Sequence, residues 1–281
     1  LDHLTCAEIN GFSHASTSCH VLIGDGLKGT DDVEVPIDGD HVTKAKIGRA
    51  VMDADIVISL SHFKCHEQTG IGGAIKNLGM GCASRAGKME QHNSGKVEVN
   101  RDRCISCGNC YRACGADAIS FPEKKAWIDP EKCVGCGRCI GVCPVDATHA
   151  IGNNTNKVLC EKMAEYAWAV VKDRPSYHIS MLRDVSPFCD CHAENDLAVI
   201  PDVGMFCSKD PVAIDVACAE IANQQPVIPG SMLDTVKDEP GDIFAKLHPT
   251  TNWRDCTEHG EKIGLGSSDY ELVRMENLPL D

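Results

Sequence analysis

Residues 104–114 read CISCGNCYRAC and residues 133–144 read CVGCGRCIGVCP, so each run spaces four cysteines as C-x2-C-x2-C-x3-C. All four cysteines recur at an offset of 29 residues. The same offset relates Asp117 to Asp146 and Ala118 to Ala147. The stretch is therefore an internal duplication, and no other part of the chain makes so specific a chemical statement.

The spacing suits an iron–sulfur cluster. Three thiolates separated by two residues let a tight loop wrap one corner of a cubane, and the fourth ligand must come from elsewhere. The two runs resemble those of bacterial two-cluster ferredoxins, in which the fourth cysteine of each run ligates the other cluster. The resemblance implies one 4Fe-4S cluster on Cys104, Cys107, Cys110 and Cys143, and a second on Cys133, Cys136, Cys139 and Cys114.

Two zinc sites or a disulfide framework are the alternative interpretations. Zinc sites favour two CxxC pairs separated by a longer loop, rather than four-cysteine runs duplicated at full length. Four glycines allow the backbone to curl around an inorganic core and aim amide N–H groups at its sulfurs; they are Gly108, Gly135, Gly137 and Gly141. Gly115 follows Cys114 where such runs usually carry proline, which loosens the turn without removing a ligand.

Length and charge bound the class of protein. The 281 residues allow one large domain and a small insert. The net charge of -14 argues against nucleic acid and against an anionic membrane surface, because both need a basic face. We therefore expect a redox protein partner or a small-molecule substrate.

Cysteine usage predicts the compartment. The chain has 18 cysteines, no signal-peptide pattern and no apolar run long enough to cross a bilayer, so we expect a reducing cytoplasm and no membrane span. The chain opens at Leu1 without an initiator methionine, and we expect further sequence ahead of it.

Apolar periodicity predicts strands alternating with helices. Strands are expected at residues 19–23, 33–35, 55–60, 177–181 and 197–200, and the apolar run at 55–60 is typical of a buried parallel strand. Helices are expected at residues 43–52, 156–172, 243–247 and 255–263, and after the N-cap Asp210 with Pro211 in the first turn. The pattern predicts an α/β fold: a mixed or parallel-sheet domain at 1–96 and 151–281, interrupted at 97–150 by a small ferredoxin-like α+β insert carrying two clusters.

The segment after the strand at 55–60 is a candidate ligand site, because ligands collect at the carboxyl ends of strands in open α/β sheets. Five of its glycines fall within residues 70–81, and Gly72 and Gly73 let the backbone approach a ligand closely. His66 and Lys76 supply titratable groups, as does His92 further on. The alternative is a mobile loop with solvated charges.

Cys189 and Cys191, followed by His192, form a second candidate site. The pair could be half of a further metal site, or buried or substrate-facing thiols. An additional metal or organic cofactor is therefore expected here or near His66 and Lys76.

Over most of its length the chain resembles a family known as domain of unknown function 362, in the type that contains a ferredoxin unit. The resemblance rests on four segments. They are residues 58–64, 72–81, 184–191 and 208–215. That family carries no agreed activity to transfer.

A local resemblance is to the catalytic subunit of lactate racemase. In that family a nickel-pincer nucleotide is attached to a lysine ten residues after one histidine and sixteen before another, and His66, Lys76 and His92 keep both spacings. Gly72 and Gly73 approximate its glycine-rich turn. The resemblance implies that Lys76 anchors a cofactor, His92 ligates a metal and His66 acts as acid or base.

Three functions are consistent with these features. The favoured one is an oxidoreductase or electron carrier that relays electrons through two 4Fe-4S clusters to a site on the α/β domain. The second is a cofactor-dependent isomerase with its chemistry at His66, Lys76 and His92. The third is a non-catalytic iron–sulfur scaffold that uses Cys189 and Cys191 to hold a transient cluster.

Overall fold

The computed structural model describes residues 2–93, 95–152, 154–192 and 196–275, and its contacts divide the chain into two units. The first unit comprises residues 1–57 and 78–175, and the second comprises residues 58–77 and 176–281. The predicted insert, residues 97–150, lies within the first unit. None of the helices in the described ranges is long and apolar enough to cross a membrane.

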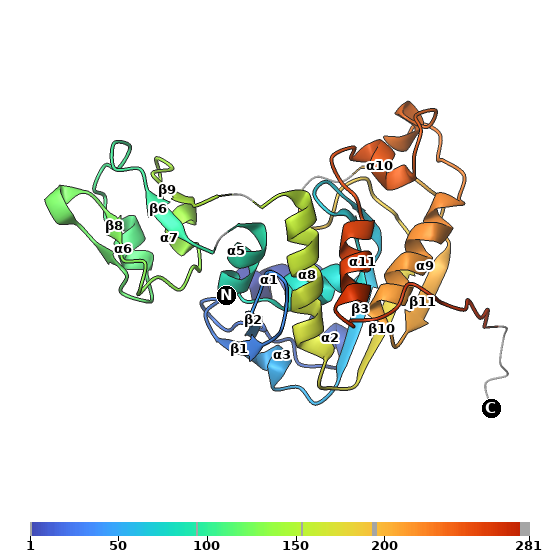
Figure 1. Ribbon diagram of the computed structural model, residues 1–281, viewed down its shortest axis with the longest axis horizontal. Coiled ribbons are helices and arrows are strands. Elements are labelled where there is room, and N and C mark those ends of the chain that lie inside the picture. Colours follow the sequence, from blue (N-terminus) through green and yellow to red (C-terminus); the bar gives the residue numbers. More distant parts are fainter. Residues whose placement is uncertain (1, 94, 153, 193–195, 276–281) are drawn as a thin grey trace. The chain divides into compact units, whose positions relative to one another are not determined.

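The first unit, outside the insert, is built on a β-hairpin and a long helix (Figure 1). Its elements are α1 (Asp2–Ile9), α2 (His14–Thr17), β1 (Asp32–Pro36), β2 (Lys44–Gly48), α3 (Arg49–Met52), α5 (Arg85–His92) and α8 (Asn156–Val171), with a π-helical turn at Asn77–Gly81. β1 and β2 pair antiparallel, and α8 packs against β2 and α5. α8 confirms the helix predicted at residues 156–172, and its apolar stripe faces the core, with Tyr166, Ala167 and Val170 at 0% exposure.

The insert repeats its own backbone. Its elements are β6 (Val97–Val99), α6 (Asn109–Ala113), β7 (Ile119–Ser120), a 3-10 turn (Pro122–Lys124), β8 (Trp127–Ile128), α7 (Arg138–Gly141) and β9 (Thr148–Ala150). β6 pairs with β9 and β7 with β8, both antiparallel. Positive φ angles recur at the offset of the duplication: Ser106 and Gly135, Gly108 and Gly137, Asp117 and Asp146. The sequence repeat is therefore also a structural repeat.

The second unit contains a three-stranded sheet in the order β11 (Gly204–Ser208), β10 (Ser176–Leu182), β3 (Val57–His62). β10 and β11 are antiparallel. β3 runs parallel to β10, because the hydrogen bonds from Val57 N to Pro175 O and from Phe63 N to Met181 O keep one register. The sheet is thus mixed, which was one of the two predicted alternatives.

Short elements complete the second unit (Figure 1). They are the hairpin β4 (Lys64–His66) and β5 (Gly70–Gly72), then α4 (Ala74–Lys76), α9 (Pro211–Asn223), a 3-10 turn (Leu233–Thr235), α10 (Ile243–Leu247) and α11 (Arg254–Lys262). α9 packs on β10 and β11, and α11 packs on α9. The predicted N-cap is confirmed, because the Asp210 carboxylate accepts hydrogen bonds from Val212 N and Ala213 N. Phe244 forms edge contacts with Phe63 and Trp253 in the core.

Three element predictions were wrong. Residues 19–23 form no strand, and Leu22 is 74% exposed with no partner strand to bury it. Residues 44–48 are a strand rather than a helix, because Ala45 and Ile47, two positions apart, both face the core. Residues 197–200 form no strand; Val199 N instead donates to Val185 O across a buried loop, and the strand comes later, as β11.

The facing of β3 also differs from expectation. Ile58 and Leu60 are 65% and 60% exposed, whereas Ser59 and Ser61 are buried. The Ser59 hydroxyl and His178 Nδ1 lie 2.9 Å apart in a hydrogen bond, so the buried polar face is partly satisfied. The apolar run at 55–60 is therefore a parallel strand, as predicted, but not a buried one.

Candidate functional site

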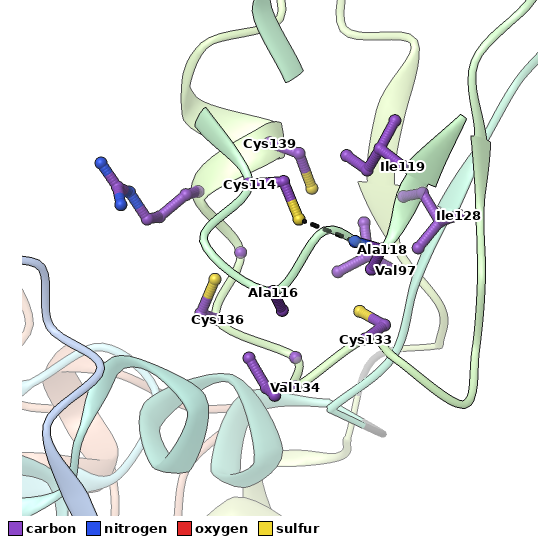
Figure 2. Close-up of a pocket in the computed structure, with 13 residues that line it drawn as sticks. Val97, Cys114, Ala116, Ala118, Ile119, Ile128, Cys133, Val134, Cys136 and Cys139 are labelled. Atoms are coloured by element: carbon purple, nitrogen blue, oxygen red, sulfur yellow. Dashed lines mark hydrogen bonds between the residues drawn. The ribbon is translucent and has the colours of Figure 1, made fainter. Parts of the chain in front are cut away.

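The eight cysteines of the duplicated runs line two separate cavities in the insert. One cavity is lined by Cys114, Cys133, Cys136 and Cys139. The other is lined by Cys104, Cys107, Cys110 and Cys143. Figure 2 shows the sulfur atoms of Cys114, Cys133, Cys136 and Cys139 turned toward one common space. Each cavity thus takes three cysteines from one run and the last cysteine from the other.

Backbone amides point at several of these sulfur atoms. Ala118 N donates to Cys114 Sγ at 3.4 Å, and its counterpart in the repeat, Ala147 N, donates to Cys143 Sγ at 3.1 Å. Burial alone would raise the pKa of Cys143, but hydrogen bonds from the Thr148 hydroxyl and from nearby amides outweigh it and lower the pKa to about 7. These hydrogen bonds favour the thiolate form of Cys143.

The pKa of Cys139, in the other cavity, shifts in the opposite direction. Burial, followed by the charges of Cys136 and Cys133, raises the pKa of Cys139 to about 12. Four converging thiolates repel one another in the absence of a countercharge. The arrangement therefore suits a cationic group that all four sulfurs share.

The second unit holds a separate cluster of reactive groups around Cys189 and Cys191. Lys76 Nζ lies 3.3 Å from Cys189 Sγ and 3.9 Å from Cys191 Sγ. His66 Nε2 lies 3.8 Å from Cys191 Sγ. One ligand atom from each of His66, Cys189 and Cys191 lies within 4.8 Å of the other two, so the three residues could hold a metal ion. Cys189 is buried and Cys191 is exposed.

Asp190, between the two thiols, is anchored from the other side of the site. Its carboxylate lies 2.8 Å from His62 Nδ1 and 3.1 Å from Lys64 Nζ. The hydrogen bond from His62 holds the pKa of Asp190 down at about 2, and the same bond raises the pKa of His62. Both His62 nitrogens face acceptors, since Nε2 lies 2.8 Å from Arg183 O. The pair therefore fixes the backbone between the two cysteines.

His66 is buried at 3% exposure, and its orientation fixes its proton. Nδ1 accepts hydrogen bonds from Gln68 N at 3.0 Å and Thr69 N at 3.3 Å, so neutral imidazole carries its hydrogen on Nε2. Burial, helped by the charge of Lys76, lowers the pKa of His66 to about 3. At neutral pH the group facing Cys191 is therefore a neutral N–H donor.

Lys76 is positioned by the short helix that it ends. The Asp215 carboxylate, on α9, accepts hydrogen bonds from Ala74 N at 2.7 Å and Ile75 N at 2.9 Å. A Cβ on Gly73 would lie 2.2 Å from Asp215 Oδ1, so only glycine lets the carboxylate reach these amides. Burial raises the pKa of Asp215 to about 6.

Gly72 opens the space between the two sides of the site. A Cβ there would lie 3.3 Å from both Lys64 Cε and Lys76 Cδ, and 3.7 Å from Cys189 Sγ. Beside the thiols, His192 Nε2 and Glu67 Oε1 lie 2.6 Å apart. Gly72 and Gly73 are thus structural for the site, each at a point of close approach.

The structure brings together most of the residues singled out in the second unit. His66, Lys76, Cys189 and Cys191 form one cluster, although the sequence placed them in two candidate sites. His92 ends α5 in the first unit, where its side chain is exposed. Sequence reasoning missed Lys64, Asp190 and Asp215 as site residues. The available signals were the place of Asp190 between two cysteines and of Asp215 at the end of the segment 208–215.

Comparison with known proteins follows the same segments. The family described as Domain of unknown function (DUF362) matches residues 1–220, which include all four segments quoted for it. No curated protein matches the chain. The match covers well over half of the 281 residues and confirms the resemblance. The chain belongs to the family described as Domain of unknown function (DUF362).

Proposed function

We propose that the chain is an iron–sulfur electron-transfer protein with two 4Fe-4S clusters, which passes electrons to the site around His66 and Lys76. The observation that carries the proposal is the sorting of eight cysteines into two cavities of four. That sorting is the one expected of a two-cluster ferredoxin, in which the last cysteine of each run crosses to the other cluster. A zinc site built on CxxC pairs would not need the exchange of Cys114 and Cys143.

The residues present fit such clusters. The sulfurs of each set converge, and amides of Ala118, Ala126 and Ala147 donate to cysteine sulfurs at 3.4, 3.5 and 3.1 Å. Such N–H···S bonds stabilise a reduced cluster. A cubane bound in each cavity would supply reversible one-electron transfer.

Basic side chains near the cavity of Cys104 and Cys107 would offset the negative charge of a thiolate-ligated cluster. Lys125 Nζ donates to Cys104 O at 2.6 Å, and Arg112 donates to Cys107 O at 3.3 Å. Both residues hold the ligand loop by its carbonyls while keeping a positive charge beside the sulfurs. Arg138 lines the cavity of Cys133 and Cys136. The expected consequence is a reduction potential that the protein can tune separately for each cluster.

The test is the metal content and electron paramagnetic resonance spectrum of anaerobically purified protein. About eight irons per chain and two reducible cubanes are expected from the two four-cysteine sets. Cys143→Ser and Cys104→Ser should damage the same cluster, and Cys114→Ser and Cys133→Ser the other, because each pair shares a cavity. Cys19→Ser, at an exposed cysteine outside both cavities, is the control. Zinc in place of iron, or pairing of Cys143 with the second set, would reject the proposal.

Two other functions stay predictions with tests of their own. The isomerase prediction places an anchored cofactor on Lys76, and intact-protein mass spectrometry would show it as an adduct on the Lys76 peptide. The scaffold prediction needs iron held by Cys189 and Cys191. It fails if replacing both cysteines leaves the iron content unchanged.

A further inference from the structure

The Cys189–Cys191 site offers two chemistries that use the same atoms: binding a metal, or cycling between a dithiol and a disulfide. The choice depends on what already faces the sulfur atoms. Lys76 Nζ lies within 3.9 Å of both sulfurs, and His66 Nε2 lies 3.8 Å from Cys191 Sγ. These two groups decide between the chemistries.

The proton on His66 argues against a metal. A histidine that ligates through one nitrogen normally keeps its N–H on the other and donates it to a second partner. Here Nδ1 is an acceptor for Gln68 N and Thr69 N, so the hydrogen sits on Nε2, the nitrogen that a metal would need. Binding through Nε2 would require an imidazolate or a rearranged loop.

The charge of Lys76 argues in the same direction. An ammonium group 3.3 Å from Cys189 Sγ occupies the position where a cation shared by the two sulfurs would gain most. Its N–H groups and the His66 N–H instead give each sulfur a hydrogen-bond donor. Burial raises the pKa of Cys191 to about 11, and Lys76 works against that rise, so these donors offset part of the cost of forming the thiolate that attacks a disulfide.

The two sulfurs are unequal in access, which divides their roles. Cys191 is exposed and can meet an external disulfide, whereas Cys189 is buried at 3% exposure and can reach only its neighbour. The backbone between them is held by Asp190 through His62 and Lys64, and His192 N donates to Cys189 O at 3.0 Å in a tight turn. The loop is therefore built to present two thiols in a fixed relation.

We propose that Cys189 and Cys191 are a redox-active dithiol pair that reduces a disulfide substrate and is itself reduced by electrons from the two clusters. The proposal rests on the proposed function for its electron supply. The Cys191 thiolate attacks the substrate disulfide, one thiol leaves, and a mixed disulfide forms. Cys189 then attacks Cys191 Sγ, the second thiol leaves, and a Cys189–Cys191 disulfide closes.

The electrons needed to reduce that disulfide match the number that the two clusters can supply. Breaking the sulfur–sulfur bond takes two electrons and two protons, and two 4Fe-4S clusters deliver one electron each. Cys191 takes its proton from solvent because it is exposed. Buried Cys189 takes its proton from Lys76, the ammonium group that touches it, and half-buried Lys76 regains a proton from water. His66 positions Cys191 through its Nε2–H.

The first experiment traps the mixed disulfide. Anaerobically purified protein is equilibrated with oxidised glutathione and mapped by peptide mass spectrometry. We expect a Cys189–Cys191 disulfide in the wild type, and glutathione that accumulates on Cys191 in Cys189→Ser. In Cys191→Ser, buried Cys189 should stay free of glutathione. Cys207→Ser, at an exposed cysteine of the same unit, should behave as the wild type at Cys189 and Cys191.

Two results of that experiment would overturn the proposal. One is a wild type in which glutathione stays on Cys191 while Cys189 remains a free thiol. The other is a stoichiometric metal that blocks both cysteines and is lost in either serine variant. Neither result depends on the clusters of the insert.

The second experiment tests the electron supply. Protein with the disulfide preformed is reduced with one electron per cluster, and the spectrum of the reduced clusters is followed with time. The signal should decay in the wild type and persist in the Cys189→Ser/Cys191→Ser double variant. A signal that persists in wild type with an intact disulfide refutes the link. Absence of iron from the purified protein would reject the proposed function instead. The glutathione experiment would then still test whether Cys189 and Cys191 form a redox-active pair.

Discussion

Replacing Gly135 by alanine tests whether the loop geometry of the second cysteine run is needed for its cluster. Gly135 lies between Cys133 and Cys136 with φ of +73°. A side chain in this left-handed region costs about 1 to 2 kcal/mol. The added Cβ would also lie 2.2 Å from Gly95 O, a contact far shorter than real Cβ atoms show.

The steric contact, rather than φ, carries most of the expected effect. Ser106 occupies the equivalent position of the first run with φ of +59°, so the loop accepts a Cβ where nothing opposes it. At Gly135 the opposing atom is a backbone carbonyl, and Gly95 is itself held by a hydrogen bond from its N–H to Asn93 Oδ1 at 2.9 Å. Relief therefore requires the ligand loop to move by about 1 Å, whereas metal–ligand distances tolerate only about 0.2 Å.

The assay is iron content and the reduced-cluster spectrum of anaerobically reconstituted Gly135→Ala. We expect the second cluster to be lost and the first to remain, so iron should fall from about eight to about four per chain. Gly141→Ala is the matched control, since its Cβ meets nothing within 4 Å and its φ is not positive. Full occupancy of both clusters in Gly135→Ala, or equal losses in the two variants, would refute the reasoning.

Three further predictions concern buried polar groups. Burial lowers the pKa of His178 to about 4, so the native state binds fewer protons than the unfolded state below pH 6.5. The free energy of unfolding should therefore fall by about 2 to 3 kcal/mol as pH drops from 6.5 to 4. Urea denaturation of the wild type and of His178→Asn checks this, and an equal pH dependence in the two proteins would contradict it. Asp215→Ala should raise amide exchange at Ala74 and Ile75 at least tenfold, because each orphaned buried amide costs about 1 to 3 kcal/mol. Asp234→Ala, at a partly exposed carboxylate that accepts no bond from these amides, should not. Glu165→Gln should lower the free energy of unfolding, measured in urea, by about 2 kcal/mol, because the buried carboxylate accepts hydrogen bonds from two backbone amides of the β1–β2 loop. An unchanged midpoint would argue that one side-chain oxygen can accept both bonds.

Local patterns in the sequence were enough wherever the physical cause is local. The repeated cysteine spacing carried the resemblance to two-cluster ferredoxins, and that resemblance implied two sets of four with Cys114 and Cys143 exchanged between the runs. Asp210 before Pro211 predicted the start of α9, because an N-cap acts within three residues. The buried stripe of α8 followed from helical periodicity alone.

Predictions failed where periodicity is ambiguous or where pairing is remote. The apolar positions of residues 43–52 fit a helix and a strand, and only the partner strand β1 decides for a strand at 44–48. The facing of β3 could not be predicted, because its buried serines are matched by His178, far along the chain. For the same reason the sequence did not predict that His66, Lys76, Cys189 and Cys191 form one cluster. Lys76 and Cys189 are 113 residues apart, and His62 and Asp190 are 128 apart.

The two kinds of chemistry are therefore held in place by different means. In the insert, each ligand loop carries its own geometry in a few left-handed residues, so damage to one loop should stay in one cluster. In the second unit, the loop with Cys189 and Cys191 takes its geometry from charged partners on β3 and β4, through Asp190. The long-range anchoring is what allows a short loop to keep two thiols close to a lysine and a neutral histidine.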